Sequence, residues 1–371
     1  MVVGDVGEGR VKRPTLEDVA ALAGVSRALV SIVVRGAPGA SAQTRQRVLQ
    51  AAAELGYRPD SRARLLARSR SRLLGVTFNV RHAFHADLLE GIYAAAEPAG
   101  YEVVLSAHTP SRDERNAVET LLDYRCEALI LLGPEAPAQR LAEFGRRVPL
   151  VVVGRRVREE SVDIVRTADD EGMQQAVEHL VALGHEDIVH VDGGHNPKAT
   201  ERRRGYRAAM RRHGLAGRIR ILPGGQTEEG GVAAARGLLK GGPLPTAVVA
   251  YDDDCAYGLL DTFRRAGVTV PTDISVVGFD DSRLSHLLNI NLTTVGQDAP
   301  AMARLAVQRA VARLAGHRVA DREVILAPRL VVRGTTAAVP APEDPAGGHG
   351  AAHPARGRPT GGAHKRGGEA R

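Results

Sequence analysis

The stretch TLEDVAALAGVS, from Thr15 to Ser26, decides the fold at the front of the chain. Thr15 is a favourable helix N-cap, and Asp18 three residues later approaches a capping box. Apolar residues then recur at helical spacing until Gly24 interrupts them. Because Ser26 is a second N-cap, the pattern predicts two short helices joined by a tight glycine turn.

A third short helix is predicted after a loop. Gly36 and Pro38 mark the loop, Ser41 is suited to cap the next helix, and Gly56 ends it. Three short helices within residues 14–60, the first two joined by a tight turn, are the layout of a helix-turn-helix unit.

The positive charge of the chain is concentrated in this first part. Residues 1–72 hold 13 Lys and Arg against 6 Asp and Glu, which gives +7, equal to the net charge of the whole chain. Residues 73–336 sum to −2 and residues 337–371 to +2. A basic front on a nearly neutral body favours contact with a polyanion, although a solvated basic face would have the same composition.

From residue 73 the pattern changes to apolar strands that alternate with helices. Buried strands of this kind are typical of parallel α/β sheets, and the length up to residue 336 suits two such subdomains. Strands are predicted near residues 73–79, 101–107, 128–132, 150–153, 188–191, 219–222, 247–251 and 274–279.

Further motifs follow TLEDVAALAGVS in a fixed order. They are SAQTRQRV from Ser41, LGYRP from Leu55, VALGHEDI from Val181, RRRGY from Arg202, DISVVGFD from Asp273 and LTTVGQ from Leu292. With these motifs the chain resembles LacI/GalR-type transcriptional regulators over about residues 14–336. The resemblance implies an all-α helix-turn-helix head followed by an α/β core of two Rossmann-like parallel-sheet subdomains, similar to periplasmic sugar-binding proteins.

The resemblance and the composition together divide the chain into five parts. We expect a flexible leader at 1–13, the head at 14–60, a hinge helix or linker at 61–72, a core at 73–336 and a disordered tail at 337–371. The core would comprise an N-subdomain at about 73–167 and 297–327 and a C-subdomain at about 168–294 and 328–336.

The second helix of such a head lies in the major groove with its first residues at the base edges. We therefore expect Arg27 to bond a guanine and Ala28 to touch a thymine methyl. Leu66 falls where the family wedges a leucine into the minor groove. The alternatives are a helical bundle that contacts no DNA, and Leu65 and Leu66 packed on the core. The predicted DNA-binding residues are Thr15, Ser26, Arg27, Ala28, Ser31, Arg35, Thr44, Arg62 and Leu66.

Two positions of the head depart from the common pattern of the family. The family often has arginine at the position of Ile32, and asparagine or a similar residue at that of Arg35. Ile32 offers no hydrogen bond, so it can only make apolar contact or face the core of the head. The operator sequence is therefore not transferable from relatives.

The core is expected to bind a small sugar-like effector between its subdomains, at the carboxyl ends of the strands. Arg202, Asp252 and Asp280 match the family's ligand-contacting positions, and such groups bond sugar hydroxyls. Relatives commonly carry asparagine at the position of Asp252, and one of the three aspartates that start there is expected to be a helix N-cap. Alternatively, Arg202 forms a surface ion pair. Weaker candidates are Asn79, Arg155 and Gln297.

These features predict a sequence-specific regulator of transcription, and repression is the expected effect on its target genes. It would bind a pseudo-palindromic, double-stranded operator as a homodimer, through surfaces near residues 85–97 and 255–266. Three alternatives remain: a soluble ligand-binding receptor, an enzyme such as a sugar kinase, and a regulator that senses a purine or no small molecule.

The sequence predicts no enzyme, no cofactor and no metal site. Cys126 and Cys255 lie far apart, and His85, His179 and His185 are not accompanied by a metal-binding spacing. No apolar run approaches the roughly 20 residues that span a bilayer, and no secretory segment is recognised. A cytoplasmic location without a membrane partner is expected.

Overall fold

The structure is a computed structural model that describes residues 14–57, 70–317 and 321–339. The expected leader, most of the expected hinge segment with Arg62 and Leu66, and residues 340–371 lie outside these described residues.

The front of the expected tail is part of the core, which corrects the predicted boundary at 337. Ala337 O lies 3.0 Å from His185 Nε2, and Val339 N donates to Leu183 O over 2.9 Å. Residues 337–339 thus satisfy polar groups just after helix α8 (Asp169–Ala182), and the core runs at least to residue 339.

The head contains the three predicted helices, α1 (Leu16–Ala23), α2 (Arg27–Val34) and α3 (Ala42–Glu54). Thr15 Oγ1 accepts from Asp18 N while the Asp18 carboxylate accepts from Thr15 N, so the capping box is complete. Gly24 takes the left-handed conformation at φ +63°, which ends α1 and turns the chain toward α2. The buried core of the head comes from all three helices and includes Val19, Val30, Val33 and Val48.

The N-subdomain is a six-stranded parallel sheet in the order β11-β5-β4-β3-β1-β2. Helices α5 and α12 pack on one face, and α6 and α7 on the other, so both faces are buried. The strands are β1 (Leu73–Asn79), β2 (Glu102–His108), β3 (Ala128–Leu132), β4 (Leu150–Val153), β5 (Val162–Thr167) and β11 (Glu323–Leu326). The helices are α5 (Phe84–Ala96), α6 (Glu114–Asp123), α7 (Ala138–Gly145) and α12 (Ala299–Leu314).

The C-subdomain repeats this plan in the order β12-β10-β9-β8-β6-β7, with α10 and α11 on one face and α8 and α9 on the other. Its edge strand β12 runs antiparallel to β10, which departs from the expected all-parallel sheet, because the chain enters it directly from β11 of the other sheet. The strands are β6 (Ile188–Asp192), β7 (Arg220–Pro223), β8 (Ala247–Val249), β9 (Ser275–Asp280), β10 (Thr293–Gly296) and β12 (Arg329–Val331). The helices are α8 (Asp169–Ala182), α9 (Ala199–Arg212), α10 (Glu228–Lys240), α11 (Asp253–Arg265) and the 3-10 turns η1 (Ala216–Arg218) and η2 (Arg283–His286).

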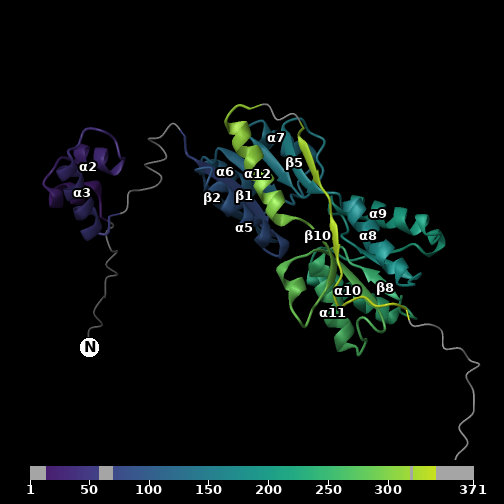
Figure 1. Cartoon of the computed structure of the whole chain (residues 1–371). Coiled ribbons are helices and arrows are strands. Elements are labelled where there is room, and N and C mark those ends of the chain that lie inside the picture. The colour runs from purple at the N-terminus through teal and green to yellow at the C-terminus, as the bar shows by residue number, and fades with distance from the viewer. Residues whose placement is uncertain (1–13, 58–69, 318–320, 340–371) are drawn as a thin grey trace, which may run out of the picture.

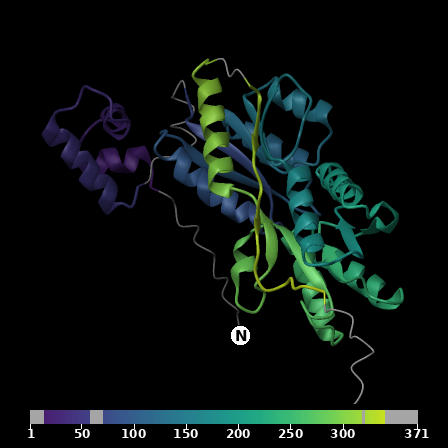
Figure 2. The ribbon, with the colours of Figure 1, turned by 45° about the vertical axis from the view of Figure 1, so that its right-hand side comes forward.

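Three short segments carry the chain between the two subdomains: from β5 to α8, from β10 to α12 and from β11 to β12. Figures 1 and 2 show the two lobes joined at this waist. The carboxyl ends of the strands bring polar loops of both lobes to the waist, which is where α/β proteins bind ligands. Among the described helices, none is both long and apolar enough to cross a bilayer.

Candidate functional site

The start of α2 presents the two residues expected to reach base edges. Arg27 and Ala28 are exposed, and Arg27 Nη1 lies 3.4 Å from Glu17 Oε1 in an ion pair whose two side chains are both more than two-thirds exposed. Ser26 Oγ accepts from Leu29 N over 3.2 Å, so Ser26 is the N-cap of α2. Such an exposed, weakly held arginine remains free to contact a partner.

The other predicted contact residues of the head are engaged in local hydrogen bonds. Thr15 forms the capping box described above, and Thr44 Oγ1 lies 2.9 Å from Ser41 Oγ. Arg35 Nε donates to Ser31 O over 3.0 Å. Ile32, the departure from the family pattern, lies against the loop after α2, close to Gly39.

Arg202 lies at the waist of the core and is 1% exposed, so it is not a surface ion pair. Its Nε donates to Asp169 Oδ1 over 2.7 Å, and its Nη1 donates to Tyr251 O. Its guanidinium carbon is 3.7 Å from the centre of the Phe279 ring. Nη2 lies 3.7 Å from Asp280 Oδ1 and has no hydrogen-bond partner within the described part of the chain.

Asp280 ends β9 and connects the two subdomains. Its Oδ1 accepts from Gln297 Nε2 over 2.6 Å, and its Oδ2 lies 4.0 Å from His82 Nε2. His82 follows β1, and its other ring nitrogen lies 3.2 Å from Asp254 Oδ2 on α11. Asp280 has φ +131°, a strained conformation for a non-glycine residue and one that recurs at functional sites.

Asp252 has two roles. Its Oδ1 accepts from Cys255 N over 2.8 Å and caps α11, which is the N-cap role anticipated for one of the three aspartates. Its Oδ2 is buried without a hydrogen-bond partner among the described residues. Burial raises the pKa of Asp252 to about 7, with Asp280 adding to the rise and His82 opposing it.

We call the residues that meet at the waist the cleft cluster: His82, Asp169, Arg202, Asp252, Asp254, Asp280 and Gln297. Of the six predicted effector residues, the structure brings four together. Asn79 Oδ1 instead accepts from Arg81 N in the turn after β1. Arg155 Nη1 donates to Pro134 O and Ala136 O and holds the loop after β3.

The sequence analysis missed His82, Asp169 and Asp254, and also Lys198, which is buried in the loop before α9. His82, Asp169 and Lys198 all follow the carboxyl end of a strand. The expectation that effector residues lie at the carboxyl ends of strands therefore also points to these three residues. The sequence does not show that these ends converge.

His82, Asp252 and Asp280 also bring one ligand atom each within 4.8 Å of one another, a grouping that could hold a metal ion. The expectation of no metal considered only spacing along the chain, whereas these three residues come from different elements. Imidazole and carboxylate suit ions such as Zn²⁺ or Mn²⁺. The positive charges of Arg202 and Lys198 beside them oppose a cation electrostatically.

Replacing Asp252 by asparagine is expected to stabilise the protein at pH 8 and much less at pH 4. A carboxyl with a folded pKa near 7 and an unfolded pKa of about 4 is protonated between these two values in the native state only, so its contribution to stability is fully present below about pH 4 and is lost progressively as pH rises to 7. His82 acts in the same direction: burial lowers its pKa, but Asp254 and Asp280 raise it further, so the net shift is upward. Asparagine keeps the cap and removes the charge.

Urea unfolding across this pH range measures the effect, which we expect to be about 1–3 kcal/mol at pH 8. Asp113→Asn is the matched control, because Asp113 caps α6 in the same way but is exposed. An equal gain at pH 4 and pH 8 would assign the effect to capping instead of to the buried charge.

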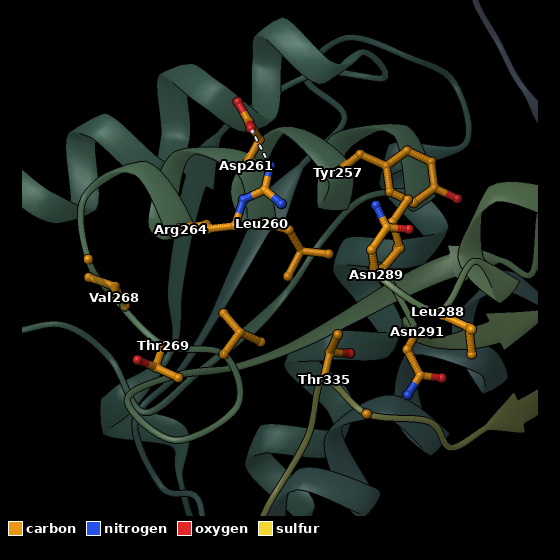
Figure 3. Close-up of a pocket in the computed structure, with 14 residues that line it drawn as sticks. Tyr257, Leu260, Asp261, Arg264, Val268, Thr269, Leu288, Asn289, Asn291 and Thr335 are labelled. Atoms are coloured by element: carbon orange, nitrogen blue, oxygen red, sulfur yellow. Dashed lines mark hydrogen bonds and ion pairs between the residues drawn. The ribbon is translucent and has the colours of Figure 1, made fainter.

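A separate cavity of about 680 Å³ lies on the outer side of the C-subdomain, away from the cleft cluster. Figure 3 shows Tyr257, Leu260 and Arg264 of α11 on one side of it and the loop with Leu288 on the other. Leu288 is 98% exposed, and Leu284 and Leu287 beside it are more than 40% exposed. A cluster of exposed leucines of this kind is typical of protein-contact surfaces.

Two family models match the chain: "Bacterial regulatory proteins, lacI family" over residues 15–60, and "Periplasmic binding protein-like domain" over residues 177–336. The HTH-type transcriptional regulator GalR of Escherichia coli K12 is 32% identical over 86% of this chain and 94% of its own. The HTH-type transcriptional regulator reg1 of Streptomyces lividans is 35% identical over 88% and 97%.

Solved structures agree with these matches. A LacI transcriptional regulator from a Rhodococcus species is 47% identical with a TM-score of 0.69, over 72% of this chain and 99% of its own. The lac repressor dimer bound to operator and an anti-inducer is 31% identical with a TM-score of 0.73, over 88% and 100%. CelR in complex with cellobiose is 32% identical with a TM-score of 0.63, over 87% and 100%. The chain thus belongs to the lacI family of bacterial regulatory proteins and is a transcriptional regulator, not an enzyme.

Proposed function

We propose that this regulator binds a pseudo-palindromic operator in double-stranded DNA as a homodimer and acts as a repressor that a small sugar-like effector controls. The head would supply base contacts through Arg27 and Ala28 and phosphate contacts through its polar side chains. Arg62 and Leu66 would contact DNA from the hinge segment. Because its target is chromosomal DNA, the protein would act in the cytoplasm.

The feature that supports effector binding most directly is the pair of unsatisfied buried atoms in the cleft cluster, Arg202 Nη2 and Asp252 Oδ2. Buried polar atoms without partners are costly, and ligand hydroxyls would accept from Arg202 Nη2 and donate to Asp252 Oδ2. The structurally similar CelR, solved with cellobiose, gives an independent reason to expect a sugar.

Effector binding would act on the contacts that join the two subdomains. Ala83 N donates to Asp254 Oδ2 over 3.1 Å, Arg283 Nε lies 3.0 Å from Asp87 Oδ1, and Arg81 pairs with Glu229. A ligand that favours one arrangement of these contacts over another changes operator affinity by the same coupling free energy, typically about 1–3 kcal/mol.

Selection from random duplex DNA with the purified full-length chain tests DNA binding, and fluorescence anisotropy with the selected sequence then tests control by sugars. We expect an enriched sequence with two-fold symmetry and at least one sugar that changes its affinity. Absence of any enriched sequence at low ionic strength would refute operator binding, and an enriched sequence without symmetry would refute the dimeric mode.

The exposed leucines beside the cavity are proposed as part of the dimer surface, together with α11, which the sequence analysis also placed there. We expect Leu288→Asp to convert the dimer to a monomer, because it places a charge in an apolar interface. Analytical ultracentrifugation measures the change. Ile325→Asp, at a residue of β11 that is 51% exposed, is the control and should remain dimeric. A Leu288→Asp protein that still sediments as a dimer would exclude this surface.

A further inference from the structure

Lys198 is a buried cation with no ion pair in the described part of the chain. It is 7% exposed and precedes α9 in the C-subdomain, yet its side chain reaches loops of the N-subdomain. A Cβ built on Gly133 would lie 3.8 Å from Lys198 Nζ, and one built on Gly154 would lie 3.9 Å from it. Among the described residues, no carboxylate comes within 4.0 Å of Nζ, and no hydrogen bond to Nζ is formed.

A second unsatisfied donor lies beside it. His85 Nδ1 accepts from Asn79 N over 3.0 Å, so the ring proton of a neutral His85 is on Nε2. The Cβ position built on Gly133 lies 3.3 Å from His85 Nε2 and 3.8 Å from Lys198 Nζ. The two nitrogens therefore lie close to the same point. Gly133 and Gly154 have no side chains, so neither residue places side-chain atoms beside the two nitrogens.

The two donors require a specific partner. An isolated buried ammonium is strongly unfavourable, and burial together with Arg202 lowers the pKa of Lys198. Asp280, Asp169 and Asp252 oppose this fall in the pKa of Lys198 electrostatically, but none of them lies within ion-pair distance of Nζ. A ligand group that only accepts, and that carries negative charge, would satisfy both donors.

We propose that the effector is a sugar bearing an acid group, a carboxylate or a phosphate, whose oxygens bind Lys198 Nζ and His85 Nε2 while its hydroxyls contact Arg202 and Asp252. This rests on the proposed function of the waist as the effector site. It distinguishes this chain from CelR, whose solved complex contains cellobiose, a neutral sugar. Because Lys198 belongs to one subdomain and His85 to the other, the acid group would connect the two lobes.

Matched pairs of sugars test the proposal on the full-length protein. D-galactose is compared with D-galacturonate, and D-glucose with D-glucuronate and with glucose 6-phosphate, by calorimetric titration and thermal shift at constant ionic strength. We expect at least one acid member to bind about tenfold to a hundredfold more tightly than its neutral partner, as charge-assisted hydrogen bonds to a buried cation provide. The two kinds of acid member distinguish a carboxylate from a phosphate ligand.

Lys198→Met and Lys198→Gln are expected to abolish this preference for the acid member, whereas Lys240→Met, at an exposed lysine of α10, should retain it. Operator binding by each variant confirms that it is folded. If no acid sugar stabilises the wild type more than it stabilises Lys198→Met, the proposal is overturned. If a neutral sugar still bound in that case, the proposal of an effector site would be retained. If no sugar of either kind bound, the result would count against the proposed function as well.

Discussion

Arg202→Met is expected to abolish the response to the effector and to lower the free energy of unfolding by about 3–5 kcal/mol. Arg202 is buried, and it contacts Asp169 and Asp280, which are buried as well. Although burial opposes it, Asp169 and the other nearby groups hold the pKa of Arg202 above its ordinary value. Removal of the guanidinium leaves the buried Asp169 without its cation and leaves Asp280 with His82 as its remaining ion-pair partner, and the penalty for unpaired buried charge dominates.

Urea unfolding measures the loss of stability, and the change in operator affinity that the effector causes measures the loss of response. Arg204→Met is the matched control, because Arg204 lies on the same helix and pairs with Asp170 over 2.7 Å but is 57% exposed. A surface pair of this kind contributes about 0–1 kcal/mol. Equal losses in the two variants would show that helix α9, and not the buried guanidinium, carries the effect.

The local features of the head could be predicted from the sequence because they are determined by neighbours in the chain. Thr15, Ser26 and Ser41 each cap a helix within three residues of themselves, and Gly24 turns the chain by its own conformation. The strands could be predicted for a related reason, since apolar runs bounded by turn residues are local patterns. The structural comparisons confirm the resulting two-lobed fold class.

The composition of the cleft cluster could be predicted only in part, because it depends on which strand ends meet. Arg202 and Asp280 were found through the family motifs, but the contact of His82 with Asp254 joins residues 172 positions apart that belong to different lobes. The surroundings of Arg155 also depend on the three-dimensional fold. Arg155 follows a strand end as expected, but its guanidinium satisfies carbonyl groups of its own subdomain. Position along the chain does not reveal which way a side chain turns.

Arg27→Ala is expected to weaken operator binding by about 2–6 kcal/mol in the dimer, because each of the two heads would lose one base contact worth about 1–3 kcal/mol. Arg27 is suited to this role because it stands exposed at the first position of α2. Quantitative gel shift on the selected operator and on a scrambled duplex, at one fixed salt concentration, measures the effect.

The comparison between the two duplexes decides what Arg27 reads. A base contact is lost from the operator only, so Arg27→Ala should reduce the specificity ratio, whereas a phosphate contact would weaken both duplexes equally. Arg236→Ala, at an exposed arginine of α10, removes the same charge from the core and should change neither affinity. Glu17→Gln should strengthen binding to both duplexes, since it removes a negative charge that lies 3.4 Å from Arg27 and would face the phosphates. If Arg27→Ala left the specificity ratio unchanged, the first turn of α2 would not contact bases in the major groove. The exposed residues of the head would then position the protein on DNA without recognising its sequence.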